Sequence, residues 1–393
     1  MKIVIIELNF HFDSLDSLCK LFDRNGNELL VFTTRQLFNK LSDVKNSKNI
    51  QFHIQRSSRL SLINNNLELI NSSDLIFINT ISRDYRTFAT VKFDPCVVLR
   101  VHNIHKTFDP LKHINWTFTS KRIWKMSSYF LREIVFGGFL YFRKKCLNNM
   151  DYFTFPDLNM QFYVLEKNFI AKSSLAPILP IKFFTEELND EKNENVFSIV
   201  IIGAVDYRRK DYAVVVDSLK NLKNSSGDEI EIVFLGNSSG ADGRKLKISF
   251  SKLNRNDITP KFYDNHVELP EFKRVIAKAD VLLAPLRQDA IVEIYEEKYG
   301  RSKTSGSLSD MITFAKPLIL AGEMDSKDSL YSFIQTYHNY LELQLIFENL
   351  IHDSSQLEVK RQDLVNHLKE KYKAEKIYTE FINFFMQKVN KIN

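Results

Sequence analysis

The sequence predicts an α/β protein built from two doubly wound, Rossmann-like domains that face each other across a cleft. Three observations lead to this prediction. The chain has 393 residues, which suits two domains of roughly 150–200 residues each. Short β-branched runs alternate with helical patterns in both halves, as in parallel sheets with both faces covered. A polar, acidic stretch at 186–195 separates the two series and is typical of a linker.

The expected elements follow the same order in each half. In the N-terminal half, residues 1–185, strands are expected at Lys2–Glu7, Glu28–Thr33, Ile50–Ile54, Asp74–Asn79, Cys96–Val101 and Tyr152–Phe155, with helices at Leu15–Asp23 and Thr34–Leu41. In the C-terminal half, residues 196–350, strands are expected at Phe197–Gly203, Glu229–Leu235, Val281–Ala284 and Pro317–Ala321, with helices at Tyr212–Leu222, Leu269–Lys278 and Leu308–Phe314. Residues 351–393 are rich in Lys and Glu with regularly spaced apolar residues. They are predicted to form C-terminal helices that pack back on the body.

Composition excludes several classes of protein. Cys19, Cys96 and Cys146 are odd in number and far apart, which argues against a disulfide framework or a cysteine zinc site and indicates a reducing compartment. The first expected strand begins at once, without a signal peptide, and the longest apolar run, 134–142, is far shorter than the ~20 residues that span a bilayer. A cytoplasmic location is therefore expected. The net charge of +6 is mild, and the basic residues form no extended stripe, so nucleic acid is not expected as a partner.

Glycines are concentrated in the second half of the chain. Only Gly26, Gly137 and Gly138 precede the linker, and the first strand is not followed by G-x-G-x-x-G, which disfavours a nicotinamide or flavin site there. Glycines at strand ends allow backbone to approach a ligand closely. Gly203 ends the first strand of the second half. This pattern points to the C-terminal half as the phosphate-binding domain, although turn glycines alone would give the same bias.

One segment, 297–320, combines a polar loop, a helix and a strand. The helix N-terminus offers free backbone N–H groups and a partial positive charge, which suit a diphosphate. Asp310, one turn into the helix, is placed to accept hydrogen bonds from ribose hydroxyls. The alternative is a surface helix capped by Ser307. The predicted phosphate-binding residues are Lys303, Thr304, Ser305 and Gly306.

The run from Asp310 to Ile319 resembles a motif of family 4-like GT-B glycosyltransferases (glycosyl transferases group 1), in which a carboxylate precedes a small apolar helix and a Gly-x-Pro-Val-Ile element. The resemblance implies the GT-B fold, with a nucleotide-sugar donor held by the C-terminal domain and Asp310 on the ribose. The family's first carboxylate falls on Ser302 here. Either the loop 303–306 replaces that carboxylate or the activity differs, because Glu296 and Glu297 lie nearby at the wrong spacing.

Two further segments are similar to this family. The stretch 199–212 resembles the opening strand and loop of the donor domain, where an Arg/Lys pair meets the diphosphate, which implies this role for Arg209 and Lys210. The stretch 268–286 resembles the helix and strand that precede the sugar-binding loop. The resemblance covers 196–321 well and the N-terminal domain only in outline.

In the N-terminal half, a hydrophobic strand ends in His102 and Asn103, the predicted catalytic residues. Ligands of open α/β sheets bind beyond the carboxyl ends of strands, so these side chains are expected to face the cleft. A histidine there has a pKa suited to proton transfer or can hydrogen-bond the donor sugar, although it can also merely cap a turn. His105, His11 after the first strand and Arg83 after the fourth are predicted to contact the acceptor.

The chain contains no D-x-D pair, which other glycosyltransferases use to hold a metal on the diphosphate. Cations and a helix N-terminus are therefore expected to offset the phosphate charge without a metal or cofactor, and the donor is expected to be UDP- or GDP-linked. Motifs of serine hydrolases, P-loop kinases and HExxH metalloproteases are also missing, which excludes those enzyme types.

A basic and aromatic segment at 120–146 is of the kind that lies in a membrane interface, although a core helix with basic ends would look the same. The leading hypothesis is a glycosyltransferase of the hexosyltransferase type that acts on a saccharide or lipid-linked acceptor. Its expected pathway is cell-surface polysaccharide or glycoconjugate synthesis. Peripheral contact with the inner face of the cell membrane, through 120–146, belongs to the same hypothesis. The alternatives are a nucleotide-sugar epimerase on the same fold and a catalytically silent GT-B protein that binds or assembles partners.

Overall fold

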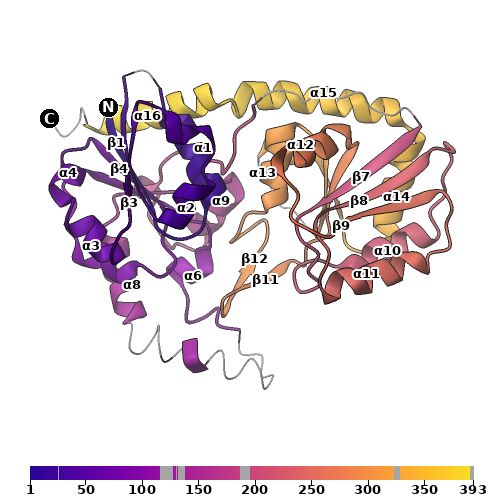
Figure 1. Cartoon of the computed structure of the whole chain (residues 1–393), viewed down its shortest axis with the longest axis horizontal. Coiled ribbons are helices and arrows are strands. Elements are labelled where there is room, and N and C mark those ends of the chain that lie inside the picture. The colour runs from indigo at the N-terminus through magenta and orange to yellow at the C-terminus, as the bar shows by residue number, and fades with distance from the viewer. Residues whose placement is uncertain are drawn as a thin grey trace.

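The structure consists of two parallel six-stranded sheets with helices on both faces (Figure 1). It is a computed structural model, and it describes residues 1–24, 26–115, 127–129, 131, 138–185, 195–322 and 328–389. The predicted linker residues 186–194 lie outside these ranges. The prediction of two doubly wound domains is confirmed.

The first sheet has the strand order β3-β2-β1-β4-β5-β6. Its strands are β1 (Lys2–Glu7), β2 (Glu28–Thr33), β3 (Ile50–Ile54), β4 (Leu75–Thr80), β5 (Cys96–Arg100) and β6 (Tyr152–Thr154). Its helices are α1 (Phe12–Phe22), α2 (Arg35–Lys40), α3 (Arg59–Asn64), α4 (Leu67–Asn71), α5 (Tyr85–Thr90), α6 (Ile104–Phe108), α8 (Phe139–Asn148) and α9 (Leu158–Glu166). The sequence located all of these strands to within about a residue, because each is a buried β-branched run.

The second sheet has the order β14-β13-β10-β7-β8-β9. Its strands are β7 (Val196–Ile202), β8 (Glu229–Asn237), β9 (Ile258–Tyr263), β10 (Val281–Ala284), β13 (Leu318–Ala321) and β14 (Ile334–Tyr337). Its helices are α10 (Tyr212–Lys220), α11 (Ala241–Ser251), α12 (Leu269–Lys278), α13 (Gly306–Phe314) and α14 (Tyr340–His352). Counted from each domain's own first strand, both sheets have the order 3-2-1-4-5-6 of a dinucleotide-binding fold.

The C-terminal helices α15 (Ser354–Lys371) and α16 (Ala374–Val389) pack on different domains. Leu364 and Leu368 of α15 join the core of the second domain. Phe381 of α16 packs with Ile3 and Ile5 of β1 against one face of the first sheet. Figure 1 shows this path as the yellow ribbon that runs over both domains. The predicted C-terminal segment therefore packs back on the body and completes the core of the N-terminal domain.

A hairpin, β11 (Asp289–Val292) and β12 (Tyr295–Lys298), leaves the second domain between β10 and α13. Ile294 and Tyr295 at its turn are buried in the core of the first domain. Backbone pairs join it to that domain, because Asn115 N–H donates to Ile294 O (2.8 Å) and Glu296 N–H donates to His113 O (2.8 Å). In Figure 1 the hairpin lies between the two domains. The sequence analysis did not predict it.

Among the described residues, none of the helices combines the length and apolar character needed to cross a bilayer. Much of the basic and aromatic segment at 120–146 lies outside the described residues. Its described part includes α8, which packs against α5 through its apolar side.

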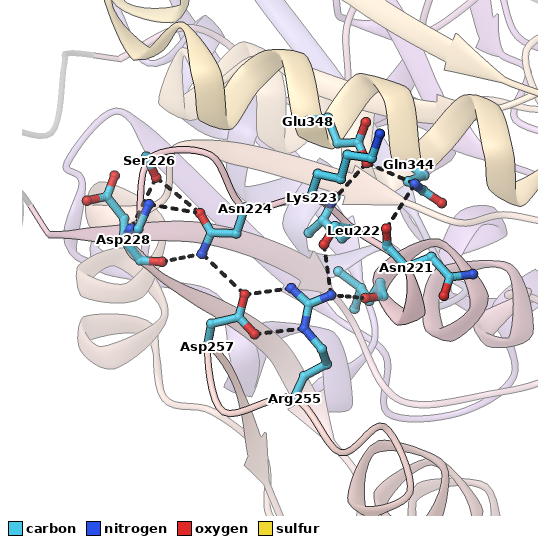
Figure 2. Close-up of polar contacts among 12 residues, drawn as sticks. Asn221, Leu222, Lys223, Asn224, Ser226, Asp228, Arg255, Asp257, Gln344 and Glu348 are labelled. Atoms are coloured by element: carbon cyan, nitrogen blue, oxygen red, sulfur yellow. Dashed lines mark hydrogen bonds and ion pairs between the residues drawn. The ribbon is translucent and has the colours of Figure 1, made fainter.

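Away from the cleft, Arg255 joins the loops that precede β8 and β9. Its guanidinium donates to both carboxylate oxygens of Asp257 (2.8 and 2.6 Å) and to the carbonyl of Leu222 (2.8 Å), and Asn224 donates to the same carboxylate (Figure 2). The hydrogen bonds from Arg255 lower the pKa of Asp257 to about 2. This network ties together the loops that lead into β8 and β9.

We expect Arg255→Ala to lower the free energy of unfolding by about 1–2 kcal/mol, since it removes a bidentate ion pair and a carbonyl partner. Because the folded pKa of Asp257 lies below its ordinary value of about 3.9, the stabilisation is complete above about pH 4 and is lost as the pH falls towards 2. Urea unfolding at pH 7 and pH 3 measures both effects, with the exposed Lys252→Ala as control. A difference between wild type and variant that does not shrink at low pH would contradict this account.

Candidate functional site

Each sheet reverses its strand order at one point, between β1 and β4 in the first domain and between β7 and β10 in the second. The loops after these strands leave in opposite directions, and this opens a crevice at the carboxyl ends. Backbone contacts bring the two crevices together. Ile104 N–H at the start of α6 donates to Ser302 O (2.9 Å), and Asn103 pairs with Lys303.

A pocket of about 120 Å³ lies at the crevice of the first domain. It collects residues from β4, β5 and the segments that follow β1, β4 and β5 in this domain, and from the hairpin and the loop before α13 of the other. Three predicted residues of the N-terminal half, His11, His102 and Asn103, line it together with Lys303, which the sequence assigned to the donor. The sequence analysis singled out these four of the lining residues and missed others, among them Arg100, Lys106 and Glu293.

His102 is held neutral in this pocket. Its Nε2 atom lies 3.1 Å from the backbone oxygen of Asn79, and its ring stacks on that of His11 at 4.6 Å. Because a carbonyl oxygen can only accept, Nε2 carries the proton and Nδ1 is left as an acceptor. Burial holds the pKa of His102 well below its ordinary value and, with the charges of Lys303 and Arg100, lowers the pKa of His11 to about 4. This lowered pKa disfavours proton transfer, so of its two predicted roles His102 is better suited to accept a hydrogen bond.

A buried polar network supports the pocket. Glu7, at the end of β1, accepts hydrogen bonds from the side chain of Asn79 (2.6 Å) and from Asn9 N–H (2.7 Å), and burial raises its pKa to about 7. Arg100 donates to Asn79 Oδ1 (3.1 Å) and to the carbonyl of Pro180 (3.0 Å). The sequence analysis did not single out Glu7 or Arg100. A charged residue within or ending an apolar strand was the signal that could have found them.

The loop between β12 and α13 is fixed to the first domain through Glu297 and Lys303. The carboxyl group of Glu297 accepts the backbone N–H groups of His105 (3.3 Å) and Lys106 (3.0 Å) at the start of α6. Lys303 Nζ donates to Asn103 Oδ1 (2.9 Å). Burial raises the pKa of Glu297 to about 7 and lowers the pKa of Lys303 to about 8.

Ser302, at the position of the family's first carboxylate, has a structural role in this loop. Its side chain is buried, and its hydroxyl accepts Lys298 N–H (2.7 Å). The hydroxyl also hydrogen-bonds Glu297 and lowers the pKa of that carboxyl group against the larger effect of burial. A carboxyl group therefore lies beside the Ser302 position, although it comes from a residue that linear spacing had excluded.

The crevice of the second domain is lined by backbone at the end of β7. Gly203 has a φ of +91°, which favours glycine, and a Cβ atom on Gly236 of β8 would lie only 2.4 Å from the carbonyl carbon of Gly203. Lys210 Nζ donates to the carbonyls of Ile202 (2.7 Å) and Gly203 (3.0 Å), and burial lowers its pKa to about 7. Lys210 thus holds the β7 loop in shape in this structure.

Arg209, next to Lys210, is exposed, and its Nη2 atom lies 3.4 Å from the hydroxyl of Tyr299. Its guanidinium is therefore the more accessible cation of the predicted pair. Across the crevice, α13 begins at Gly306, and a Cβ atom placed there would meet nothing within 4 Å. Ser305 is the N-cap, since its hydroxyl accepts Ser307 N–H (3.1 Å). The helix N-terminus is thus open, as an anion site requires.

Asp310 lies on α13 with its carboxylate bound by Lys182 of the segment that joins the domains (2.9 Å). Although burial alone would lower the pKa of Lys182, Asp310 raises it. Asp13 at the start of α1 adds a second negative charge near this lysine. No local sequence signal pointed to Lys182. Thr304 lies beside Asp157, the N-cap of α9.

Two predicted acceptor residues lie outside the pocket lining. His105 is buried, with its Nδ1 atom 2.7 Å from Glu296 O of the hairpin and its Nε2 atom 2.8 Å from the hydroxyl of Tyr163 on α9. Arg83 lies 3.4 Å from the carboxylate of Glu293 at the hairpin turn. The placement of His105 does not fit acceptor contact, because it lies in α6 and both of its ring nitrogens already have partners.

Comparison with known proteins identifies the fold. No protein-family model matches the sequence, and no curated protein matches it. HepE from Anabaena in complex with UDP has a TM-score of 0.62 at 13% identity, covering 98% of this chain and 100% of its own. The chain has the GT-B fold. OtsA has a TM-score of 0.59 at 12% identity, covering 98% of both chains. The pneumococcal O-GlcNAc transferase GtfA in complex with UDP and GlcNAc has a TM-score of 0.57 at 10% identity, covering 98% and 99%.

The GT-B fold explains why the site is divided between two domains. Each Rossmann-like domain supplies one crevice, and the chain crosses between the domains twice, with Phe184 N–H donating to the carbonyl of Tyr372 (3.0 Å) at the crossings. The hairpin adds a further connection, so that α6 and the loop before α13 are positioned by the same element. The two crevices are thus presented to each other.

Proposed function

We propose that this GT-B protein is a glycosyltransferase that moves a sugar, as a hexosyl group, from a nucleotide-diphosphate donor to a saccharide or lipid-linked acceptor. The observation that carries the proposal is the pairing of an open helix N-terminus in the second domain with a buried histidine- and cation-lined pocket in the first. HepE, which shares the fold, was crystallised with UDP and glucose, and GtfA with UDP and GlcNAc. Their ligands support UDP as the first nucleotide to test.

On the donor side, the N-terminus of α13 with Thr304, Ser305 and Gly306 would receive the diphosphate, and Arg209 would add a mobile positive charge. Asp310 would accept the ribose hydroxyls. Gly203, with Lys210 holding its loop, would let the backbone approach the nucleotide. We propose that these cations and the helix N-terminus offset the phosphate charge without a metal.

On the acceptor side, Nδ1 of His102 would accept a hydrogen bond from a sugar hydroxyl, and the amide of Asn103 would orient the same group. Lys303 would hold Asn103 in place, because its ammonium donates to the side-chain oxygen of Asn103 (2.9 Å). Closure of the two crevices around the substrates would exclude water and favour transfer over hydrolysis.

The pocket lining argues for transfer over epimerisation. An epimerase on this fold needs carboxylates that face the sugar, whereas Glu293 is the carboxylate that the described pocket lining contains. Its Oε2 atom accepts from Lys106 (2.7 Å) and from the hydroxyl of Tyr129 (2.7 Å). A carboxylate bound by these two donors is poorly placed to move protons on a sugar.

A role in cell-surface polysaccharide or glycoconjugate synthesis, with peripheral membrane contact, belongs to the same proposal. Helix α8 exposes Tyr141 (66% exposed) beside the exposed Lys144 and Lys145. An aromatic ring next to two cations suits the interface of an anionic membrane, where lipid-linked acceptors are presented.

Thermal shift with UDP-, GDP-, ADP- and CMP-linked sugars tests the donor site. We expect a UDP- or GDP-linked sugar to raise the Tm and free nucleotide to be released only with a suitable acceptor. Release of an isomerised nucleotide sugar without acceptor would indicate an epimerase. Stabilisation by none of the nucleotides would overturn the proposal and leave a silent binding protein.

The state of His102 gives a separate prediction. We expect His102→Ala to lower kcat/KM about tenfold through the loss of one hydrogen bond (about 1.4 kcal/mol), and His102→Gln to retain more activity because its amide can still accept. Since burial keeps His102 neutral, the wild-type profile of kcat/KM against pH should show no inflection near pH 6.5 that depends on this residue. An inflection there that His102→Gln abolishes would assign proton transfer to His102 instead.

A further inference from the structure

The acceptor-side pocket contains more buried positive charge than its carboxylates offset. Arg100, Lys106 and Lys303 line it, and Arg100 and Lys106 are buried while Lys303 is half-buried. Lys106 is paired with Glu293 (2.7 Å). Arg100 lies near Glu7 and Lys303 near Glu297, but among the described residues neither cation forms a direct ion pair with its acid. Because a buried cation without a direct ion pair is costly, this arrangement favours the binding of an anion.

The neighbouring acids do not remove this surplus. Glu7 and Glu297 are buried, burial raises the pKa of each carboxyl group, and each already accepts two N–H hydrogen bonds, Glu7 from Asn79 and Asn9, and Glu297 from His105 and Lys106. Burial lowers the pKa of Arg100 and of Lys303, while the nearby Glu7 raises the first and the nearby Glu297 raises the second. The two histidines are neutral and can donate or accept without adding charge.

The hydrogen-bonding capacity of the pocket points the same way. Nη2 of Arg100 has no hydrogen-bond partner among the described residues, although the guanidinium is buried. Lys303 Nζ donates to Asn103 and retains further N–H donors. At the same pocket, Phe10 is 61% exposed and offers an apolar surface to the uncharged part of a ligand. Cations, neutral polar groups and one aromatic ring together suit a sugar that bears a charged substituent.

We propose that this pocket binds the anionic group, a carboxylate or a phosphate, of a negatively charged acceptor sugar, with Lys303 and Arg100 as its cationic ligands. The description of the ligand as an acceptor rests on the proposed function, whereas the binding of an anion in this pocket does not depend on it. It narrows the acceptor from any saccharide or lipid-linked sugar to one with a negative charge near the reacting hydroxyl. Ser82 and Asn103 supply further polar contacts in the same pocket.

Calorimetric titration of the full chain tests this inference. Glucose 6-phosphate and glucuronate are the charged probes, and glucose is the matched uncharged probe. We expect both charged sugars to bind at least tenfold more tightly than glucose, and Lys303→Gln to weaken them about tenfold or more. Arg100→Gln is a second variant with the same expectation. The exposed Lys298→Gln, five residues from Lys303, makes the same charge change outside the pocket and should leave the affinities unchanged.

Saturating UDP separates the two possible sources of negative charge. If the charged sugars still bind with UDP present, the anion site is distinct from the diphosphate site, as proposed. If UDP displaces the charged sugars, the positive charge serves the donor and the inference fails. It also fails if Lys303→Gln weakens the binding of UDP-glucuronate but not the binding of any free charged sugar. Equal binding of glucose and glucose 6-phosphate would also overturn it. If the protein binds nucleotide sugars but not charged sugars, the anion site fails and the proposed function stands. If it binds charged sugars but not nucleotide sugars, the proposed function fails and the anion site stands.

Discussion

Replacing Asp310 by alanine is expected to weaken binding of the nucleotide-sugar donor about 100-fold and to lower kcat/KM to the same extent. Asp310 lies one turn into α13, beyond the open N-terminus that would receive the diphosphate. Hydrogen bonds to a charged group contribute about 1.5–3 kcal/mol each, and a tenfold change corresponds to about 1.4 kcal/mol. Loss of two such bonds to the ribose hydroxyls therefore accounts for the expected size.

The ion pair with Lys182 provides the matched variant. Lys182→Met keeps a side chain of similar length but removes the ammonium that lies 2.9 Å from the carboxylate of Asp310. If the carboxylate binds ribose, Lys182→Met should retain most donor affinity, because Asp310 is still present and has one partner fewer. If Asp310 serves only to balance Lys182, the two variants should lose donor affinity to a similar extent.

Titration calorimetry with UDP and with UDP-glucose measures the loss directly, and urea unfolding shows whether the fold is retained. Asp310→Ala leaves the buried Lys182 without its partner, so some loss of stability is expected together with the loss of affinity. Asp310→Asn, which keeps an oxygen for Lys182, should recover stability more than donor affinity. Unchanged affinity for UDP and UDP-glucose in Asp310→Ala would remove Asp310 from the donor site.

The strands of both sheets could be located from the sequence because parallel strands are buried on both faces and form continuous apolar runs. β1, β2, β3 and β10 begin and end at the predicted residues. The elements that were missed carry weaker patterns. β9 (Ile258–Tyr263) alternates with Thr259 and Lys261 at the edge of its sheet, and β14 (Ile334–Tyr337) is short and also at an edge.

The hairpin was missed for a different reason. Its sequence, from Asp289 to Lys298, contains five charged residues interspersed with five apolar ones, without the continuous apolar run of a buried parallel strand, so it resembles a solvated loop. Its apolar residues Ile294 and Tyr295 are buried by the other domain, and its acids bind groups on that domain. Such partners are distant in the sequence, and no local pattern reports them. The same is true of the docking of α16 on β1.

The sequence indicated which strand ends carry the polar residues of the candidate site, but it did not indicate which partners their side chains contact. His11, His102 and Asn103 follow strands of the first sheet and line one pocket, because the carboxyl ends of parallel strands meet at one edge. The roles of single side chains depend on neighbours from other elements. The ammonium of Lys210 donates to a carbonyl at the end of β7, and the ring of His105 hydrogen-bonds the backbone of the hairpin. Pairs such as Lys182 with Asp310 require the fold before they can be found.

Replacing Tyr295 by alanine is expected to lower the free energy of unfolding by about 3–5 kcal/mol, as for other buried aromatic residues. Tyr295 belongs to the hairpin of the second domain, but its ring is fully buried in the core of the first, 6.2 Å from the ring centroids of Tyr129 and Phe139. A loss of this size corresponds to a fall in Tm of roughly 10 °C for domains of this length. Calorimetry of the full chain measures it, with Ile291→Ala, at a residue of the same hairpin that is 42% exposed, as control.

The two domains should respond differently to this change, because the hairpin links them. Without the Tyr295 ring, the hairpin can detach locally, and this releases Glu297 from the N-terminus of α6 and Lys303 from Asn103. Amide hydrogen exchange should therefore rise at 104–108 and 289–303 while the strands of the second sheet keep their protection. Reaction rate should fall even below the new Tm, since the loop before α13 loses its fixed position. Unchanged exchange at 104–108 in Tyr295→Ala would show that the hairpin does not position α6, and the coupling between the two crevices would have to run through the crossings at Phe184 and Tyr372 instead.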